Sequence, residues 1–268
     1  MDIASDHAII TLTTDFGLQD PYAGQLKGVL LSGCPTATII DITHAIPAWD
    51  VVTAAVTIRT SYAFFPSGSI HLVVVDPGVG GPRSILVAEG DGHFFIAPDN
   101  GILSLLVVDH KIETIHRVEN PVFFPASVSP TFHGRDVMAP VAAALANGRA
   151  VHDFGAPVSL QAIQLIIVPS AVPDAKSLYG QVQRIDHFGN VRTTIRVGRG
   201  HLETASFQSL EISDQRIATL ARTYSDVALG ALLVLIDSSG YLEIAANQAN
   251  AAEILSCVPG DRITVYLG

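Results

Sequence analysis

The 268-residue sequence has few charged residues, few aromatic residues and a deficit of basic ones. Charged residues make up 15% of the chain and aromatic residues 7%, and 15 Lys and Arg stand against 25 Asp and Glu, so the net charge is −10. No run of Lys or Arg occurs. Because neutralising nucleic-acid phosphates requires a basic surface, this composition argues against a nucleic-acid partner.

Cysteine is also scarce. Cys34 and Cys257 lie far apart and form no CxxC pair, so they predict neither a disulfide framework nor a zinc site. The apolar run LGALLVLI at 229–236 is too short to cross a bilayer, and the N-terminus lacks the basic start and apolar run of a secretory signal. We therefore expect a cytoplasmic protein with two buried, reduced thiols and no membrane partner.

In the first two-thirds of the chain, short β-branched runs alternate with amphipathic stretches. The runs that predict buried strands are residues 8–13, 37–42 and 69–75. Between them, Asp20 and Pro21 predict the N-cap and first turn of a helix ending near Gly33, and Asp50 is a candidate cap for a helix over 51–65. The β-α-β-α-β order predicts an α/β fold with a mainly parallel sheet covered by helices.

Beyond the third strand the pattern changes. Residues 84–89 and 93–97 flank a Gly-Asp-Gly sequence, which predicts a hairpin. Residues 135–147 predict a helix that ends at Gly148, and residues 163–168 predict another strand.

The last third is rich in β-strand signals. The runs that predict strands are residues 179–186, 191–197, 232–237, 241–245 and 263–268. Gly-, Asp- and Ser-rich turns separate them, and one helix is expected at about 248–255, so a small antiparallel β-barrel is predicted. We expect an α/β domain over 1–170 and a barrel domain over 178–268, joined by a linker at 171–177 that contains proline and small polar residues.

Polar residues follow each of the three early strands. The first strand is followed by Thr14 and Asp15, the second ends in Asp41 with His44 close behind, and the third is followed by Asp76. In open α/β sheets, ligands bind beyond the carboxyl ends of the strands. A single residue of this kind is more often a cap or turn former, but three at one edge favour a site.

Two further segments carry candidate site residues of the first domain. DPGVGGPRS at 76–84 has neither the GK[ST] nor the GxGxxG spacing of a phosphate loop, but its tight turn brings Asp76 toward Arg83, as a structural salt bridge or as part of a site. His133 directly precedes the predicted helix at 135–147, where a structural role is the commoner one. The ten histidines are scattered without ligand spacing, so no metal is expected.

Three more segments allow a structural or a functional interpretation. DHFGN at 186–190 is a good turn sequence, and SSGYLEIAANQ at 238–248 begins as a hairpin turn. Trp49, the only tryptophan, belongs to the core or provides a platform for a flat ring.

Taken together, these segments resemble the S-adenosylmethionine (SAM) hydroxide adenosyltransferases, which are relatives of fluorinating and chlorinating enzymes that use the same substrate. The matching stretches occur in the family's order along essentially the whole chain. They are TDFGLQDPYAGQLKGVL, DITHAIPAWD, VVDPGVGGPRS, APDNGILS, TFHGRDV, IDHFGN and SSGYLEIAANQ.

The resemblance implies hydrolysis of SAM by attack of water on the ribose 5′ carbon, giving adenosine and L-methionine with no cofactor. It also implies a homotrimer whose sites lie at subunit interfaces, between one N-terminal domain and a neighbour's C-terminal domain. Asp76, Arg83 and His133 match the residues that position and activate the water. Asp15 would hold the ribose hydroxyls, while Tyr22 and Trp49 would line the substrate pocket.

In the second domain, the resemblance assigns Asp186 to the methionine ammonium group. Phe188 and Asn190 would contact adenine with Asn247 nearby, and Ser238 would lie near the methionine carboxylate.

The chemistry suits these residues. The sulfonium departs as a neutral thioether, so the enzyme's task is to hold and activate water. Asp76 could accept a hydrogen bond from it, Arg83 could stabilise hydroxide character, and His133 could orient the group or take the proton. Which of the three receives the proton stays open.

The halogenating relatives differ from this chain at several positions. They carry an aromatic residue near Asp76, a serine near Gly134 and a longer hairpin loop, and fluorinating relatives carry arginines where this chain has Ser239 and Ala246. A carboxylate beside the nucleophile would repel a halide. The alternatives are a SAM-dependent halogenase, a non-catalytic SAM- or adenosine-binding protein, a metal-dependent nucleoside hydrolase and, least favoured, a methyltransferase.

Overall fold

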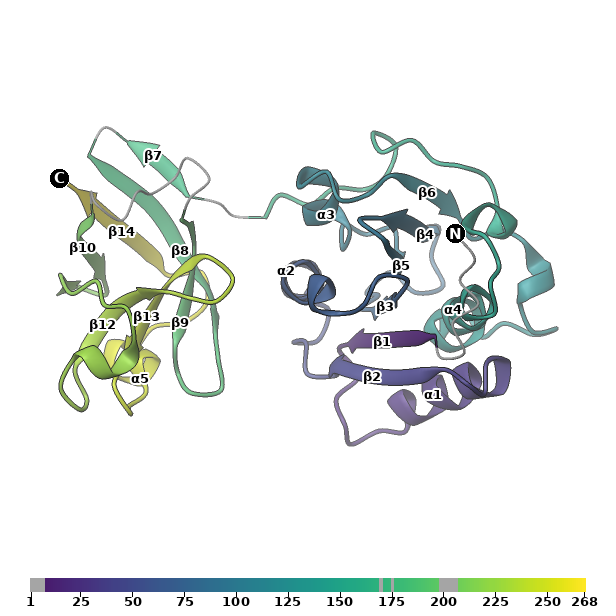
Figure 1. Ribbon diagram of the computed structural model, residues 1–268, viewed down its shortest axis with the longest axis horizontal. Coiled ribbons are helices and arrows are strands. Elements are labelled where there is room, and N and C mark those ends of the chain that lie inside the picture. Colours follow the sequence, from purple (N-terminus) through teal and green to yellow (C-terminus); the bar gives the residue numbers. More distant parts are fainter. Residues whose placement is uncertain (1–7, 169–170, 175, 198–206) are drawn as a thin grey trace. The chain divides into compact units, whose positions relative to one another are not determined.

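The strand pairings separate the chain into two units. The computed structural model describes residues 8–168, 171–174, 176–197 and 207–268 (Figure 1). The α/β unit covers Met1–Ile167 and the barrel unit covers Val168–Gly268. No helix in these described ranges has the length and apolar character needed to span a membrane.

The α/β unit is built on one six-stranded sheet. Its strands are β1 (Ile9–Thr14), β2 (Thr38–Thr43), β3 (Ile70–Val74), β4 (Ile85–Gly90), β5 (His93–Pro98) and β6 (Thr114–Arg117). The spatial order is β2-β1-β3-β5-β4-β6, with β2, β1, β3 and β5 parallel to one another and β4 antiparallel to both of its neighbours. The predicted mainly parallel sheet is therefore confirmed.

Helices cover both faces of this sheet (Figure 1). The α-helices are α1 (Tyr22–Gly33), α2 (Val51–Ser61), α3 (Ser104–Val108) and α4 (Ala139–Ala146). The 3-10 helices are η1 (Tyr62–Phe64), η2 (Pro121–Phe123) and η4 (Val151–Phe154), and η3 (Gly134–Met138) is a π-helix. On β3, Leu72 and Val74 join the core under α1 and α4, whereas Val73 joins the core under α2 and α3. Burial on both faces explains why the strand is continuously apolar.

The predicted helix starts have different outcomes. Asp50 caps α2 as expected, since its carboxylate accepts a hydrogen bond from the Thr53 backbone N–H at 2.8 Å. For α1 the prediction of Asp20 as N-cap is wrong, because the helix begins at Tyr22 and Pro21 occupies the cap position, where it offers no side-chain acceptor.

The hairpin prediction is confirmed and one strand prediction is wrong. Strands β4 and β5 pair through Gly90 and His93, and the two turn residues have φ of 51° and 78°, as a tight primed turn requires. Residues 163–168 form no strand. Instead of pairing with a strand, the backbone N–H groups of Gln164 and Ile166 donate hydrogen bonds to the side chains of Asp99 and Ser104.

The barrel unit is an antiparallel, nearly closed sheet, as predicted. Its strands are β7 (Val172–Asp174), β8 (Ser177–Ile185), β9 (Val191–Arg196), β10 (Phe207–Ile212), β11 (Gln215–Ile217), β12 (Leu232–Ile236), β13 (Tyr241–Ala246) and β14 (Arg262–Leu267). The order is β11-β10-β14-β8-β9-β13-β12, and a bridge between Leu220 and Val234 brings the two ends together. The turn η6 (Tyr224–Asp226) and the helix α5 (Ala251–Leu255) complete the unit.

Within the expected linker at 171–177, the structure places a strand. Val172–Asp174 forms β7, which pairs with β8, and Ser177 is already the first residue of β8. Strands β10 and β11 had no counterpart among the predicted elements, because their polar residues gave no clear apolar run.

Two glycines test the packing of the α/β unit. A Cβ at Gly90 would lie 2.1 Å from the Lys111 carbonyl oxygen, whereas one at Gly28, exposed on α1, would meet nothing within 4 Å. We expect Gly90→Ala to destabilise the protein by about 1–3 kcal/mol or more. Gly28→Ala should stabilise it by about 0.5–1 kcal/mol. Thermal unfolding midpoints measure both, and equal shifts would contradict the packing described.

Candidate functional site

The carboxyl edge of the parallel strands gathers the polar residues predicted for the α/β unit. Arg83 Nε donates to Asp76 Oδ1 at 2.8 Å, and Arg83 Nη2 donates to Asp76 Oδ2. The same Nη2 lies 2.9 Å from His133 Nδ1. The Asp76 and Arg83 side chains are only 7% and 10% exposed. Asp76, Arg83 and His133, called the trio below, therefore form one connected and largely buried group.

Glycines let the chain bring the trio together. Gly80 has φ of +78°, and a Cβ there would lie 2.4 Å from the Pro130 carbonyl oxygen, so the 76–84 turn lies directly against the segment before His133. Gly134 begins η3, and its missing Cβ would lie 2.7 Å from Val74 on β3. These two close approaches position His133 at the end of β3.

The hydrogen bonds of the trio assign the protonation state of His133. A guanidinium can only donate, so His133 Nδ1 accepts and the neutral ring carries its proton on Nε2. Burial lowers the pKa of His133, and the Arg83 charge lowers it further against the opposing effect of Asp76 and Asp136. The trio thus combines one carboxylate, one guanidinium and one neutral imidazole.

Asn100 is a neighbour of the trio that the sequence reasoning did not single out. Its Nδ2 donates to the Val75 carbonyl oxygen at 2.9 Å, next to Asp76 in the chain. This hydrogen bond fixes the end of β3. In the sequence, the only indication of Asn100 was its position in the turn after β5.

Asp15 and Trp49 meet at the same edge of the sheet. The Trp49 backbone N–H donates to Asp15 Oδ2 at 2.9 Å. Trp49 is 73% exposed, which excludes the core interpretation of its side chain. Tyr22 packs against Phe16 and Phe132, with ring centroids 5.8 and 5.5 Å apart, and stays 45% exposed.

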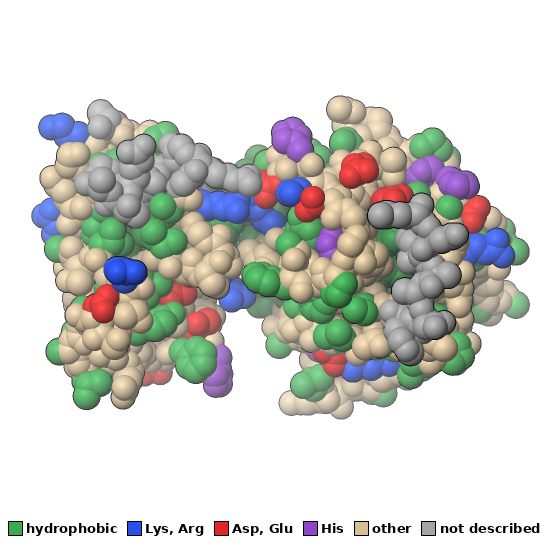
Figure 2. Space-filling view, in the orientation of Figure 1, with side chains coloured by type: hydrophobic (Ala, Val, Ile, Leu, Met, Phe, Trp, Pro, Cys, Tyr) green, Lys and Arg blue, Asp and Glu red, His purple; other side chains and the backbone are tan. Residues whose placement is uncertain are grey.

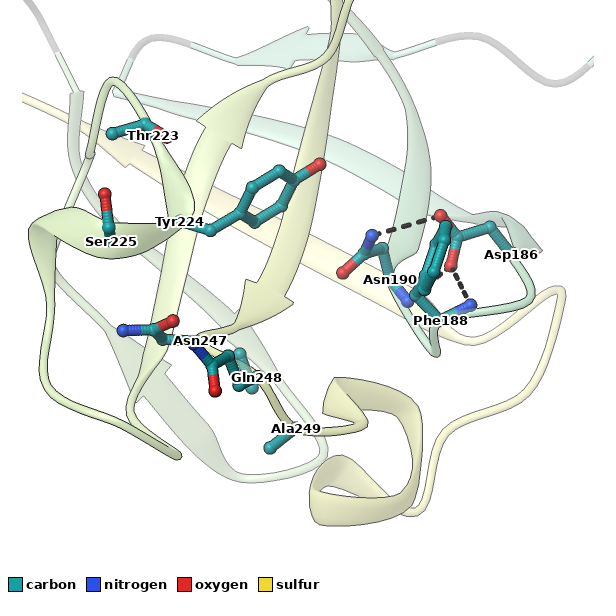
Figure 3. A pocket seen from close by; sticks show the side chains of 10 residues that line it. Asp186, Phe188, Asn190, Thr223, Tyr224, Ser225, Asn247, Gln248 and Ala249 are labelled. Atoms are coloured by element: carbon teal, nitrogen blue, oxygen red, sulfur yellow. Dashed lines mark hydrogen bonds between the residues drawn. The ribbon is translucent and has the colours of Figure 1, made fainter.

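The barrel unit holds a pocket of about 760 Å³ that contains four of its five predicted site residues (Figure 3). The lining residues are Asp186, Phe188, Asn190, Thr223, Tyr224, Ser225, Ala246, Asn247, Gln248 and Ala249. Ser238 is not among them and lies exposed in the turn between β12 and β13. Its neighbour Ser239 accepts a hydrogen bond from Arg192, which also pairs with Asp237.

A tight turn between β8 and β9 shapes one wall of this pocket. Asp186 Oδ1 accepts hydrogen bonds from the backbone N–H groups of Phe188 and Asn190, and its Oδ2 accepts one from Asn190 Nδ2 at 3.0 Å (Figure 3). Gly189 has φ of +85°, and a Cβ there would clash with Asn250. The turn interpretation of DHFGN is therefore correct, and the turn also presents the Phe188 ring, which is 74% exposed.

The opposite wall includes Tyr224, which the sequence reasoning missed. Its hydroxyl donates to Glu243 Oε1 at 2.9 Å, and Glu243 is only 7% exposed. Burial raises the pKa of both groups, that of Tyr224 to about 12. The sequence signal that could have located this wall is Thr223 followed three residues later by Asp226, because this pair forms a capping box at the start of η6.

Charge and metal-binding potential can be judged over the described residues. Figure 2 shows acidic and basic side chains interspersed on the face in view. In the ranges that the structure describes, no three His, Cys, Asp or Glu side chains gather as a metal ion would require.

The chain combines two units. The α/β unit carries a polar trio at its sheet edge and the barrel unit carries a pocket, which is an architecture of two-domain enzymes. The chain belongs to the SAM hydroxide adenosyltransferase family. The family's N-terminal domain profile matches residues 10–155, and its C-terminal domain profile matches residues 180–264.

Similar proteins span the full length of the chain. It is 39% identical over 261 residues to "(R)-S-adenosyl-L-methionine hydrolase" of Salinispora tropica, covering 97% of this chain and 98% of that one. It is 30% identical over 295 residues to "Fluorinase" of Actinoplanes sp., covering 98% of each. An uncharacterized conserved protein from Thermotoga maritima has a similar crystal structure, with a TM-score of 0.88, 33% identity and coverage of 96% and 99%.

The protonation of His133 gives a direct test of the trio. In the wild type, its imidazole should titrate below the ordinary value of 6.5, because burial and Arg83 both disfavour the cation. Arg83→Met removes the cation and leaves Asp76, so the midpoint should rise. Arg59→Met, which breaks a different Arg–Asp pair with Asp109, is the matched control and should leave it unchanged. Histidine NMR titration, assigned with His133→Asn, measures each midpoint, and no rise in Arg83→Met would contradict the assignment.

Proposed function

We propose that this protein hydrolyses SAM, with a water molecule attacking the ribose 5′ carbon to give adenosine and L-methionine. The observation that carries the proposal is the buried trio of Asp76, Arg83 and neutral His133 at the sheet edge. The Salinispora relative named as a SAM hydrolase, at 39% identity, supports the same reaction.

The reaction needs a positioned nucleophile more than an acid. The C–O bond to water forms as the C–S bond breaks, and the bonding pair leaves on sulfur as a neutral thioether. The water loses a proton in the process. Holding the water in line with the C–S bond supplies up to about 7–11 kcal/mol by effective molarity.

The hydrogen bonds within the trio favour Asp76 as the group that accepts a hydrogen bond from the attacking water. Arg83 occupies one lone pair on each carboxylate oxygen, and each oxygen keeps another for water. His133 Nδ1 is already engaged by Arg83, so the ring orients the guanidinium and offers its Nε2 proton. The attacking water becomes acidic as it bonds to carbon and gives up its proton along the hydrogen bond to Asp76.

The same carboxylate disfavours a halide nucleophile. Its free lone pairs can accept a hydrogen bond from water, whereas a halide ion has no proton to donate to them. Halogenation and SAM binding without turnover remain the alternative outcomes of the test below.

The remaining site residues serve to bind substrate. Asp15 holds the ribose hydroxyls, and Tyr22 and Trp49 line the nucleoside side of the pocket. Asp186 meets the methionine ammonium group, and Ser238 the carboxylate. Phe188, Asn190 and Asn247 contact adenine. The lining of one pocket by Asp186, Phe188, Asn190 and Asn247 supports this assignment.

We infer a homotrimer in which the α/β unit of one subunit and the barrel unit of the next form each site. The exposure of Trp49 and Phe188, at 73% and 74%, supports the inference, because both are large apolar side chains assigned to a substrate pocket. The reaction uses no metal or other cofactor, and the protein works in the cytoplasm.

Product analysis tests the proposed reaction. Purified protein is incubated with SAM in chloride-free buffer containing EDTA, and adenosine is followed by HPLC. We expect adenosine from the wild type and a decrease of about 10²–10⁴-fold for Asp76→Asn, which keeps the shape and removes the charge.

A 5′-haloadenosine as main product on adding halide would identify a halogenase. Bound SAM without any product would leave a binding protein, and either result would overturn the proposal.

Subunit mixing tests the shared site. Asp76→Asn inactivates the α/β side, and Asp186→Ala inactivates the barrel side. If each site combines two subunits, unfolding and refolding an equal mixture of the inactive variants should restore about a quarter of wild-type activity. The control is each variant refolded alone. Activity that stays at the level of the separate variants would show that each site belongs to one chain.

A further inference from the structure

A line of polar side chains connects β1, β2 and α1 at the edge that carries Asp15. Thr14 Oγ1 lies 2.8 Å from His44 Nδ1, and His44 Nε2 lies 3.1 Å from Asp41 Oδ1. Asp41 Oδ2 in turn accepts a hydrogen bond from Lys27 Nζ at 2.6 Å. Thr14 and His44 are buried, at 0% and 5% exposure, whereas Asp41 and Lys27 are about one-third exposed.

This arrangement has the order hydroxyl, imidazole, carboxylate, but the Thr14 hydroxyl does not act as a nucleophile. The Thr14 hydroxyl has no access to solvent, and its oxygen also accepts a hydrogen bond from the Phe16 backbone N–H. The hydroxyl and His44 Nδ1 share one hydrogen bond, and His44 Nε2 faces Asp41. A buried and directional contact of this kind holds a fixed geometry.

Thr14 and His44 also join the two loops that carry the nucleoside residues. The Gly17 N–H donates to the His44 carbonyl at 2.8 Å, and the Ile46 N–H donates to the Thr14 carbonyl at 3.3 Å. Asp15 follows Thr14 directly and accepts the Trp49 N–H. Trp49 itself has φ of +66°, a strained value for a bulky residue that its surroundings must maintain.

We propose that Thr14 and His44 are positioning residues for the ribose of the substrate. Their side-chain contact fixes the loop after β1, and this loop presents the Asp15 carboxylate to the two ribose hydroxyls. The inference rests on the proposed function for the identity of the nucleoside and for the contact of Asp15 with the ribose hydroxyls. It implies that loss of the contact weakens nucleoside binding and raises the KM for SAM, while kcat changes little, because the trio is untouched.

The chain contains a matched control for this contact. Thr11, on the same strand β1, lies 2.8 Å through its Oγ1 from Nδ1 of the buried His71 on β3. This pair has the same chemistry, length and burial, but it lies three residues before Thr14, and its hydrogen bonds lead to His93 and not to Asp15 or Trp49.

The experiment compares Thr14→Val with Thr11→Val in the full-length protein. Calorimetry measures the binding of adenosine and of 2′,3′-dideoxyadenosine, which lacks the ribose hydroxyls. Steady-state kinetics with SAM gives KM and kcat. We expect Thr14→Val to weaken adenosine binding by about 5- to 30-fold and to leave the weaker dideoxyadenosine binding unchanged. Thr11→Val should alter neither, and Thr14→Ser should restore wild-type affinity.

Three outcomes would overturn the inference. The first is that Thr14→Val weakens the binding of adenosine and of dideoxyadenosine equally. The second is that Thr11→Val weakens adenosine binding as much as Thr14→Val does, and the third is that the wild type binds neither nucleoside. A wild type that binds adenosine but releases none from SAM refutes the proposed reaction alone, because the nucleoside comparison still decides the role of Thr14.

Discussion

The buried ion pair between Asp76 and Arg83 is the interaction on which the site of the α/β unit depends. Removing two charges from water is costly, and the two-point contact between guanidinium and carboxylate is the geometry that best offsets this cost. The pair closes the 76–84 turn on itself and directs the second N–H of Arg83 Nη2 at His133, whose pKa is lowered by burial and further by the Arg83 charge. One contact therefore determines the shape, the charge and the proton positions of the trio.

The two units place their polar residues in different ways. The central strands of the parallel sheet are buried on both faces, and the polar residues of the candidate site, Thr14, Asp15, His44 and Asp76, lie at or just beyond the ends of strands. The barrel unit instead builds its pocket from connections between strands, through the 186–190 turn, η6 and the segment after β13. The first unit holds its charged side chains in fixed positions, and the second lines its pocket with the aromatic rings of Phe188 and Tyr224 beside polar side chains.

Much of the fold and part of the site could be predicted from the sequence, for identifiable reasons. Continuous apolar runs revealed β1, β2 and β3, and the polar residues after them lie at the carboxyl edge of the sheet, as the pattern predicted. The spacing of Asp76 and Arg83 across a glycine-rich turn revealed their contact, and family resemblance added His133. Local patterns were insufficient where distant partners decide. Residues 163–168 have the sequence of a strand, but their backbone N–H groups donate hydrogen bonds to the side chains of Asp99 and Ser104 instead. Tyr224 is held in the pocket wall by its hydrogen bond to Glu243, nineteen residues away.

The approach of Gly80 to the Pro130 carbonyl has a consequence for how such a protein can diverge. Any side chain at position 80 would push away the segment that leads to His133, so the backbone frame around the trio tolerates little drift. A change at position 76 alone would leave the Arg83 guanidinium buried without its carboxylate partner, so divergence at the trio requires a coordinated exchange of both side chains on a preserved backbone.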